Sequence, residues 1–134
     1  MTNIFQMKLD SIQPSQLYIN TEKLRYVMRL LKSKPFSVKP VPVKKIGNQV
    51  VLVDGHTRAF AAFLLGISEI SVQWEDEELD WEEYEVCVKW CEEEGIHTIS
   101  DLKKRVVSSR DYQILWLDRC AQMQKDLEEK RKVT

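Results

Sequence analysis

The sequence lacks the features that would place it in several specialised classes of protein. It has three cysteines, an odd number clustered late in the chain, which argues against a disulfide framework and for a reducing compartment. No apolar run approaches the roughly 18 residues that indicate a membrane span. The first residues have neither the basic start nor the apolar core of a secretion signal, so we expect a cytoplasmic protein with no membrane partner. Walker-type loops and the Gly-x-Ser-x-Gly and HExxH motifs are also absent.

Length and composition predict one small globular domain. Two independent cores within 134 residues would each be near the lower size limit for folding alone. Hydrophobic residues make up 43% and charged residues 31%, which excludes a disordered or collagen-like chain. We therefore predict a single domain over residues 1–134, with a helical extension over 79–130 packed on a body over 7–74. The extension has too few residues and too many acids for a core of its own.

The net charge of −1 conceals three blocks of different sign. Residues 1–74 carry a net charge of +6, residues 75–94 carry eleven acids and one lysine, and residues 95–134 carry a net charge of +3. The acidic block repels phosphate backbones, so we do not expect nucleic acid as a partner. It is a solvated helix face, a patch that recruits a basic protein partner, or a nucleic-acid mimic. The basic first block would attract a phosphorylated small ligand.

Periodicity and turn signals predict strands and helices in the first half of the chain and helices alone in the second. Asn20 or Thr21 can cap a helix that runs to about Lys32. Gly47-Asn48 between two β-branched runs predicts a hairpin. The predicted strands cover residues 7–12, 41–46, 49–53 and 67–74, and the predicted helices cover 20–32, 56–65, 80–95, 98–105 and 109–128.

One junction between a strand and a helix has the properties of an anion site. An apolar strand over 50–53 runs into Asp54 and Gly55 and then directly into a helix that begins at His56. The first backbone N–H groups of a helix have no partner within the helix, and the helix dipole makes this end positive. Such an end binds anions, and Gly55 lets the backbone approach a ligand without a Cβ.

The side chains at this junction suit phosphate chemistry. Thr57 adds a hydroxyl donor, and Arg58 adds a permanently charged fork that can contact phosphate through two bonds. His56 can donate to a phosphate oxygen or act as an acid or base near neutral pH. Asp54 can coordinate Mg²⁺ or orient a hydroxyl group. Each residue also has a simple structural role open to it, as a cap, a surface residue or an ion-pair partner, but the five together favour a phosphate or nucleotide site.

This segment resembles the phosphate-binding box of the ParB/sulfiredoxin superfamily. The resemblance rests on Asp54-Gly55-His56-Thr57-Arg58 followed by Ala59-Phe60-Ala61-Ala62 and Leu65-Gly66, with the Ile12-Gln13-Pro14 opening, the hairpin and the Ile70-Ser71-Val72 strand in their expected places. It covers about residues 7–74 and implies an α+β fold, a small mixed sheet with helices, on which the helical extension packs. It also implies binding of nucleotide phosphates, since members include DNA-partition proteins that bind CTP, sulfiredoxins that use ATP, free-serine kinases and reported nucleases.

Departures from the family narrow the expected activity. Sulfiredoxins place a catalytic cysteine in the box, where this chain has His56 and Thr57, so we do not expect sulfiredoxin activity. Partition proteins continue into a helix-turn-helix domain, whereas this chain continues into the acidic block. Free-serine kinases carry a catalytic glutamate soon after the proline of the opening segment, and here the nearest acid after Pro14 is Glu22.

Three functions follow as hypotheses. The first is a small nucleotide-dependent phosphotransferase or nucleotide hydrolase. In it Gly55, His56, Thr57 and Arg58 hold a nucleoside triphosphate or diphosphate, Asp54 and His56 are catalytic, and Asp54 is the ligand of Mg²⁺. The second is a non-catalytic module that senses a nucleotide and binds a basic protein through the acidic residues. The third is a ParB-like nuclease, for which only the basic first block could supply a surface.

Two further groups of residues have a structural and a functional interpretation. Cys87 and Cys91 lie one helical turn apart, ahead of His97, and form either part of a soft-metal site or a pair of buried, inert thiols. Aromatic residues are frequent in the second half of the chain and are either core or a stacking surface for a base. Trp74 is the best candidate for stacking, because it ends the strand that follows the box.

Overall fold

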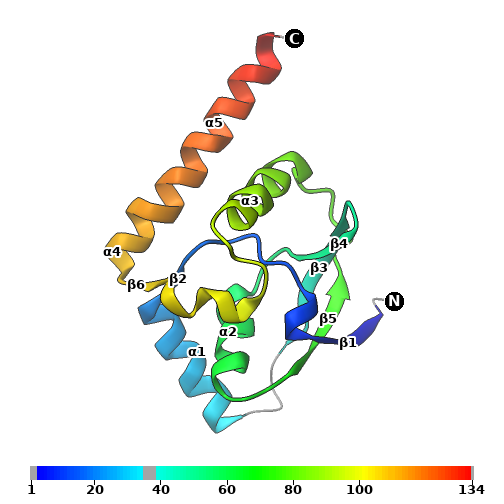
Figure 1. Cartoon of the computed structure of the whole chain (residues 1–134), viewed down its shortest axis with the longest axis vertical. Coiled ribbons are helices and arrows are strands. Elements are labelled where there is room, and N and C mark those ends of the chain that lie inside the picture. Colours follow the sequence, from blue (N-terminus) through cyan, green and yellow to red (C-terminus); the bar gives the residue numbers. More distant parts are fainter. Residues whose placement is uncertain (1–2, 35–38, 134) are drawn as a thin grey trace.

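The computed structural model describes residues 3–34 and 39–133, and strands and helices are mixed along the chain before the helical extension begins (Figure 1). The strands are β1 Ile4–Lys8, β2 Ile19–Asn20, β3 Val41–Ile46, β4 Gln49–Leu52, β5 Glu69–Trp74 and β6 Val106–Val107. The α-helices are α1 Thr21–Ser33, α2 His56–Leu64, α3 Trp81–Glu93, α4 Ser109–Tyr112 and α5 Asp118–Val133. Leu9–Ser11 and Ile99–Lys104 are 3₁₀ helices, and Gln113–Leu117 is a π-helix.

A mixed four-stranded sheet forms the centre of the body, in the order β1-β5-β3-β4 (Figure 1). β1 pairs antiparallel with β5, β5 runs parallel to β3, and β3 and β4 form the predicted hairpin, in which Val43 lies opposite Leu52. Val41, Val43, Leu52 and Val72 are almost fully buried, because the apolar face of the sheet is covered. The predicted α+β class is therefore confirmed.

The predicted first strand is wrong in its bounds. β1 covers Ile4–Lys8 instead of residues 7–12, and a 3₁₀ turn follows it. From this turn the chain crosses to the outer edge of β4, where Gln13 pairs with the strand in parallel. Leu9 and Ile12 lie in and directly after this turn, and both side chains are buried in the core. The spacing of apolar residues alone does not distinguish such a buried turn from a strand.

Helices α1 and α2 pack against each other beside the sheet. Asn20, one of the two residues predicted as the cap, caps α1, and its Oδ1 accepts hydrogen bonds from two amides of the first turn at 2.9 and 3.4 Å. Val27 and Leu31 of α1 are buried against Ala61 of α2. Alanines along α2 have small side chains, which lets the helices and the sheet approach closely around the segment that carries the box.

The helical extension shares a hydrophobic core with the body. Cys91, Leu102, Trp116 and Met123 belong to the same cluster of buried side chains as Leu17 of the opening segment. The strands β2 and β6 pair in parallel and join the start of α1 to the start of α4. Each has two residues, which is too short for a periodic pattern, and neither was predicted.

The predicted last helix over 109–128 differs from the structure in two ways. It is interrupted by the π-helix Gln113–Leu117, and it continues as α5 to Val133. The far half of α5 extends away from the body (Figure 1). Within the described segments, none of the helices has the length and apolar character needed to cross a membrane.

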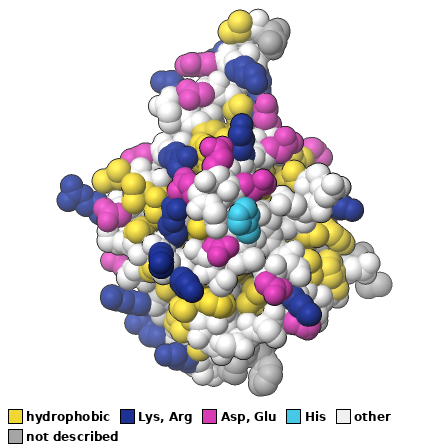
Figure 2. All heavy atoms as spheres, in the orientation of Figure 1, with side chains coloured by type: hydrophobic (Ala, Val, Ile, Leu, Met, Phe, Trp, Pro, Cys, Tyr) yellow, Lys and Arg dark blue, Asp and Glu magenta, His cyan; other side chains and the backbone are white. Residues whose placement is uncertain are grey.

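Opposite charges of the acidic block and the last helix meet in the structure. Arg131 lies 2.8 Å from Asp80 and 2.8 Å from Glu82, at the start of α3. Glu94 pairs with Arg105 at 2.7 Å, at the other end of that helix. In Figure 2, Lys and Arg side chains gather at the lower left, over α1, whereas acidic and basic side chains intermingle near α5.

Candidate functional site

The junction between β4 and α2 brings Asp54 to Arg58 to one end of the sheet. β4 ends at Leu52, and Gly55 is the N-cap residue of α2. Gly55 has a φ of +81°, a left-handed conformation that favours glycine. A Cβ at this position would lie 2.7 Å from Cγ1 of Val41, so the close packing also requires glycine here.

The first turn of α2 is positively charged and uncapped. No side chain caps it, and it contains no acidic residue. The first bond within the helix runs from Ala59 N–H to the Gly55 carbonyl, 2.9 Å, so the amides of residues 56–58 have no acceptor within the helix. The guanidinium of Arg58 lies beside Gly55 and donates through Nη1 to the Lys39 carbonyl at 3.2 Å. Helix dipole and guanidinium together favour an anion at this end.

The His56 side chain is buried and connects the box to the opening segment. It is 4% exposed, and its Nε2 accepts a hydrogen bond from Ser15 N–H at 3.0 Å. Burial lowers the pKa of His56 to about 4. The negative charge of Asp54 raises this pKa by a smaller amount, and the positive charge of Lys23 lowers it further. The ring is therefore neutral at pH 7, with its proton on Nδ1 because Nε2 acts as an acceptor. A catalytic role for this histidine stays a prediction.

The remaining box residues differ in their access to solvent. Asp54 is exposed, and Arg58 is half-buried. Thr57 is 4% exposed, so most of its side chain is packed within the protein. Asp54 and Arg58 are thus the two box side chains that a ligand in solvent reaches most readily, and a phosphate contact through Thr57 stays a prediction.

Electrostatic interactions link Lys23, Tyr84 and Tyr112 to the box, and of these the sequence pointed only to Tyr84, as one of several aromatic residues that could stack on a base. Lys23, in the first turn of α1, is near enough to His56 for its charge to act on that ring. Burial raises the pKa of Tyr84, and the Asp54 carboxylate adds to the effect. Burial also raises the pKa of Tyr112 to about 12, with contributions from Cys120 and Asp54. No local signal links these residues to the box, because they come from three separate helices that only the tertiary structure brings within electrostatic range of Asp54 or His56.

The other candidate functional residues, Trp74, Cys87 and Cys91, pack among neighbouring side chains. Trp74 is 44% exposed and packs on Phe5 of β1, with ring centroids 5.4 Å apart. Cys87 and Cys91 are buried, and a hydrogen bond to Cys120 together with burial raises the pKa of the Cys87 thiol. Across residues 3–34 and 39–133, no three His, Cys, Asp or Glu side chains form a group that could hold a metal ion.

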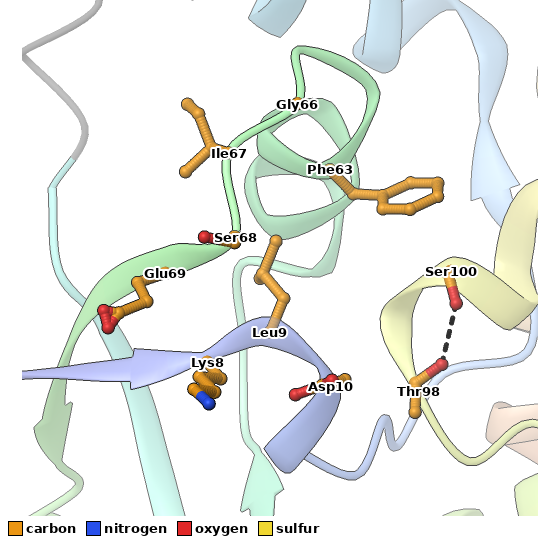
Figure 3. A pocket seen from close by; sticks show the side chains of 10 residues that line it. All are labelled: Lys8, Leu9, Asp10, Phe63, Gly66, Ile67, Ser68, Glu69, Thr98 and Ser100. Carbon is orange, nitrogen blue, oxygen red and sulfur yellow. Dashed lines mark hydrogen bonds between the residues drawn. The ribbon is translucent and has the colours of Figure 1, made fainter.

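Two cavities lie at opposite ends of α2. One, of about 640 Å³, lies where the helix ends, and there the ring of Phe63 points toward Thr98 and Ser100, whose hydroxyls bond each other at 2.9 Å (Figure 3). The other, of about 180 Å³, is lined by Val53 and His56 on one side and by the helical extension on the other. A helix of nine residues is about 13 Å long, so only the smaller cavity adjoins the box.

No protein-family model matches the sequence, and no curated protein matches it. Solved structures do match the fold. Protein Atu1540 from Agrobacterium tumefaciens is 14% identical, with a TM-score of 0.54, and the match covers 76% of this chain and 62% of that protein. The chain therefore spans less than two thirds of the length of that protein.

Two further structures are similar at lower TM-scores. A Pnob8-like ParB-N domain is 18% identical, with a TM-score of 0.48, and the match covers 67% of this chain and 37% of that one. Sulfiredoxin from Arabidopsis thaliana is 15% identical, with a TM-score of 0.48, and the match covers 64% of this chain and 97% of that one. At these identities the likeness concerns the fold alone. The predicted α+β fold is confirmed, and its structural neighbours include ParB/sulfiredoxin-like proteins.

Proposed function

We propose that this chain binds the phosphates of a nucleotide at the N-terminus of α2. The observation that carries the proposal is the uncapped first turn of this helix, which begins at a left-handed glycine and has the Arg58 guanidinium beside it. Lys23 adds a second positive charge close to His56. Backbone amides, the helix dipole and fixed cations are the groups that recognise phosphate in proteins.

The chemistry that suits this site is phosphoryl transfer or nucleotide hydrolysis. In such reactions the protein supplies positioning and charge. Magnesium in nucleotide sites is held by one or two carboxylates together with phosphate oxygens, and the exposed Asp54 fits that set of ligands. Neutral His56 fixes the opening segment against the box through Ser15.

A non-catalytic nucleotide sensor is the second candidate. The observation that favours it is the hydrogen bond from Ser15 N–H to Nε2 of His56. His56 is one of the two residues predicted to be catalytic, and this bond engages one of its two ring nitrogens in a structural contact. In this case the box would bind a nucleotide without turnover, and the nearby helical extension would transmit the bound state to a partner.

Calorimetry of phosphate-ligand binding tests the shared part of both candidates. We expect ATP, CTP, GTP or tripolyphosphate to bind the wild type, and Arg58→Ala to weaken binding by about 10- to 150-fold, which corresponds to the roughly 1.5–3 kcal/mol of a charged hydrogen bond. Arg25→Ala removes a similar charge from an exposed position of α1 and serves as the control. Equal affinities of the two variants would overturn the assignment of the box.

Turnover separates the two candidates. With Mg²⁺ and a bound nucleotide, the enzyme hypothesis predicts release or transfer of phosphate that Asp54→Asn abolishes while nucleotide binding persists. Asp76→Asn, at another exposed acid, should leave turnover unchanged. Binding without any phosphate release by the wild type would favour the sensor.

A further inference from the structure

The cavity of about 180 Å³ beside the box has walls from both parts of the chain. The body contributes the opening segment and the two residues that flank Asp54 and Gly55. The helical extension contributes the rest, and this part lies outside the residues that carry the family resemblance. The lining residues are Ser15, Gln16, Val53, His56, Glu83, Tyr84, Cys87, Trp116, Cys120, Met123 and Gln124.

A buried histidine ring lines this cavity. His56 is 4% exposed and lines the wall, and its Nε2 is engaged by Ser15 N–H at 3.0 Å. Because Nε2 accepts this bond, the ring proton is on Nδ1, which can act as a donor. No acceptor for Nδ1 is found among the described residues, and no fully enclosed side-chain nitrogen there lacks a partner, so Nδ1 keeps some access to solvent on a ring that lines the cavity. A ligand with an acceptor atom would complete this bond.

The helical extension contributes aromatic and thioether side chains to the lining of the cavity. The π-helix Gln113–Leu117 carries Trp116, which is 6% exposed and lines the cavity with Met123 and Tyr84. Trp90 and Trp116 form an edge-to-face pair, with centroids 6.0 Å apart and planes at 81°, which restricts the orientation of both rings. Single turns of π-helix occur often at functional sites, because they re-aim a side chain that a regular helix would point elsewhere. Aromatic and thioether walls of this kind suit a planar ring.

The rim of the cavity offers polar groups of both kinds. The Glu83 carboxylate and the Gln124 amide both line the cavity, and Gln124 lies near enough to Glu83 to act on the pKa of its carboxyl group. A carboxylate can accept from an amino group, and an amide can donate to a ring nitrogen or carbonyl. With the donor at His56, these groups match a heterocycle that has both an amino group and acceptor atoms.

We propose that this cavity binds the base of the nucleotide whose phosphates the box holds, and that it favours bases with an exocyclic amino group. The inference rests on the proposed function. Whole ligand pockets are typically about 300–1,000 Å³, so a cavity of about 180 Å³, the space of about six water molecules, suits one part of a ligand. Val53 and His56 border both the cavity and the box, so a base and its phosphates can occupy the two at once.

The experiment compares tripolyphosphate, ATP, CTP, GTP and UTP by calorimetry on the full chain. We expect at least one amino-bearing nucleotide to bind at least tenfold more tightly than both tripolyphosphate and UTP. Cys120→Phe, which fills the cavity, and Glu83→Ala, which removes the acceptor at its rim, should each abolish this excess and leave tripolyphosphate binding unchanged. Ala121→Phe adds the same ring at an exposed position of α5 and should change nothing.

Each outcome is informative, and circular dichroism checks that the variants are folded. Equal binding of tripolyphosphate and all the nucleotides would overturn the base site and leave the phosphate site standing. The Glu83 side chain lies at the rim and not in the core, so Glu83→Ala should fold. If this variant still binds the amino-bearing nucleotide more tightly than tripolyphosphate and UTP, the base site is overturned as well. Failure of every ligand, tripolyphosphate included, would instead overturn the phosphate site and the base site together.

Discussion

At the scale of single residues, the box is held in place from both sides. Gly55 turns the chain in a conformation that other residues rarely adopt, and its hydrogen atoms allow the contact with Val41. His56 accepts the amide of Ser15, whose hydroxyl in turn donates to the Leu52 carbonyl at 2.7 Å. These bonds tie the opening segment to the strand and to the helix at the point where they meet. The residues of the box therefore build the site as well as line it.

Replacement of Gly55 by alanine should destabilise the fold more than the same change at Gly66. Both glycines have a positive φ, +81° and +79°, so both variants lose roughly 1–2 kcal/mol through backbone strain. The new Cβ at position 55 also meets Cγ1 of Val41 at 2.7 Å, whereas at position 66 nothing lies within 4 Å. Urea unfolding should show an additional loss of about 1 kcal/mol or more for Gly55→Ala. Equal losses would mean that the contact with Val41 is relieved at no cost.

Folding stability should fall in mild acid because of His56. The pKa of its ring is about 4 in the fold and 6.5 for a free histidine side chain, so the unfolded chain binds a proton that the folded chain does not. The contribution is complete above pH 6.5 and is lost as the pH falls toward 4, on the order of 2 kcal/mol between pH 7.5 and 5. Urea unfolding at both pH values checks this. His56→Gln should remove most of this difference, and an identical pH dependence in the variant would contradict it.

At the scale of elements, short segments link the body to the helical extension. Oδ1 of Asn20 caps α1 and also accepts from the Ser109 hydroxyl at 3.1 Å, at the start of α4. The parallel pair of β2 and β6 lies beside this contact. Gln13 donates to the carbonyl of Ile96, which follows α3, at 2.8 Å. The extension is thus attached through hydrogen bonds as well as through the core, and the π-helix follows directly from α4.

The π-helix should matter for stability mainly through Trp116. This side chain is 6% exposed and packs on Trp90, so Trp116→Ala removes a large buried ring at a cost of about 3–5 kcal/mol. Ile114 belongs to the same π-helix but is 52% exposed, so Ile114→Ala should change stability by less than about 0.5 kcal/mol. Thermal unfolding of both variants checks the contrast. Similar losses would show that the π-turn itself, and not the buried ring, dominates.

At the scale of the whole molecule, charges that are separated in sequence partly neutralise one another. Arg131 of α5 bridges Asp80 and Glu82, and Arg105 and Arg119 bridge Glu94. Exposed pairs of this kind contribute little to stability and weaken with salt. Their main effect is on the surface potential, because they reduce the negative charge that residues 75–94 present to a partner.

A basic ligand should therefore bind to the acids that precede α3 and not to those that pair with α5. Asp76, Glu77 and Glu78 are exposed. Glu77→Gln combined with Glu78→Gln should weaken the binding of a fluorescent oligolysine severalfold at low salt, as measured by anisotropy. The control pair, Glu128→Gln with Glu129→Gln, has the same charge change on exposed positions of α5. Equal weakening by both pairs would show that net charge, and not the acidic segment, attracts the peptide.

Local patterns in the sequence were sufficient for the elements around the site. The hairpin at Gly47-Asn48, the cap at Asn20 and the start of α2 at His56 all appear as predicted. Each depends on turn residues or helical spacing within a few positions, and these local preferences do not depend on the tertiary structure. The glycine junction at residue 55 belongs to this group, and its left-handed conformation agrees with the turn expected there.

The surroundings of the box were decided only by the tertiary structure. The burial of His56, the approach of Lys23 and Tyr84, and the cavity beside Val53 all join segments that are distant in sequence. The bond between Ser15 and His56 spans 41 positions. Burial and long-range contacts set the pKa of a side chain and its access to a ligand, and neither is encoded in the local pattern around that residue. The sequence by itself therefore determined the glycine turn and the helix start at which we propose that phosphate binds, and the packing of the helical extension determined what surrounds them.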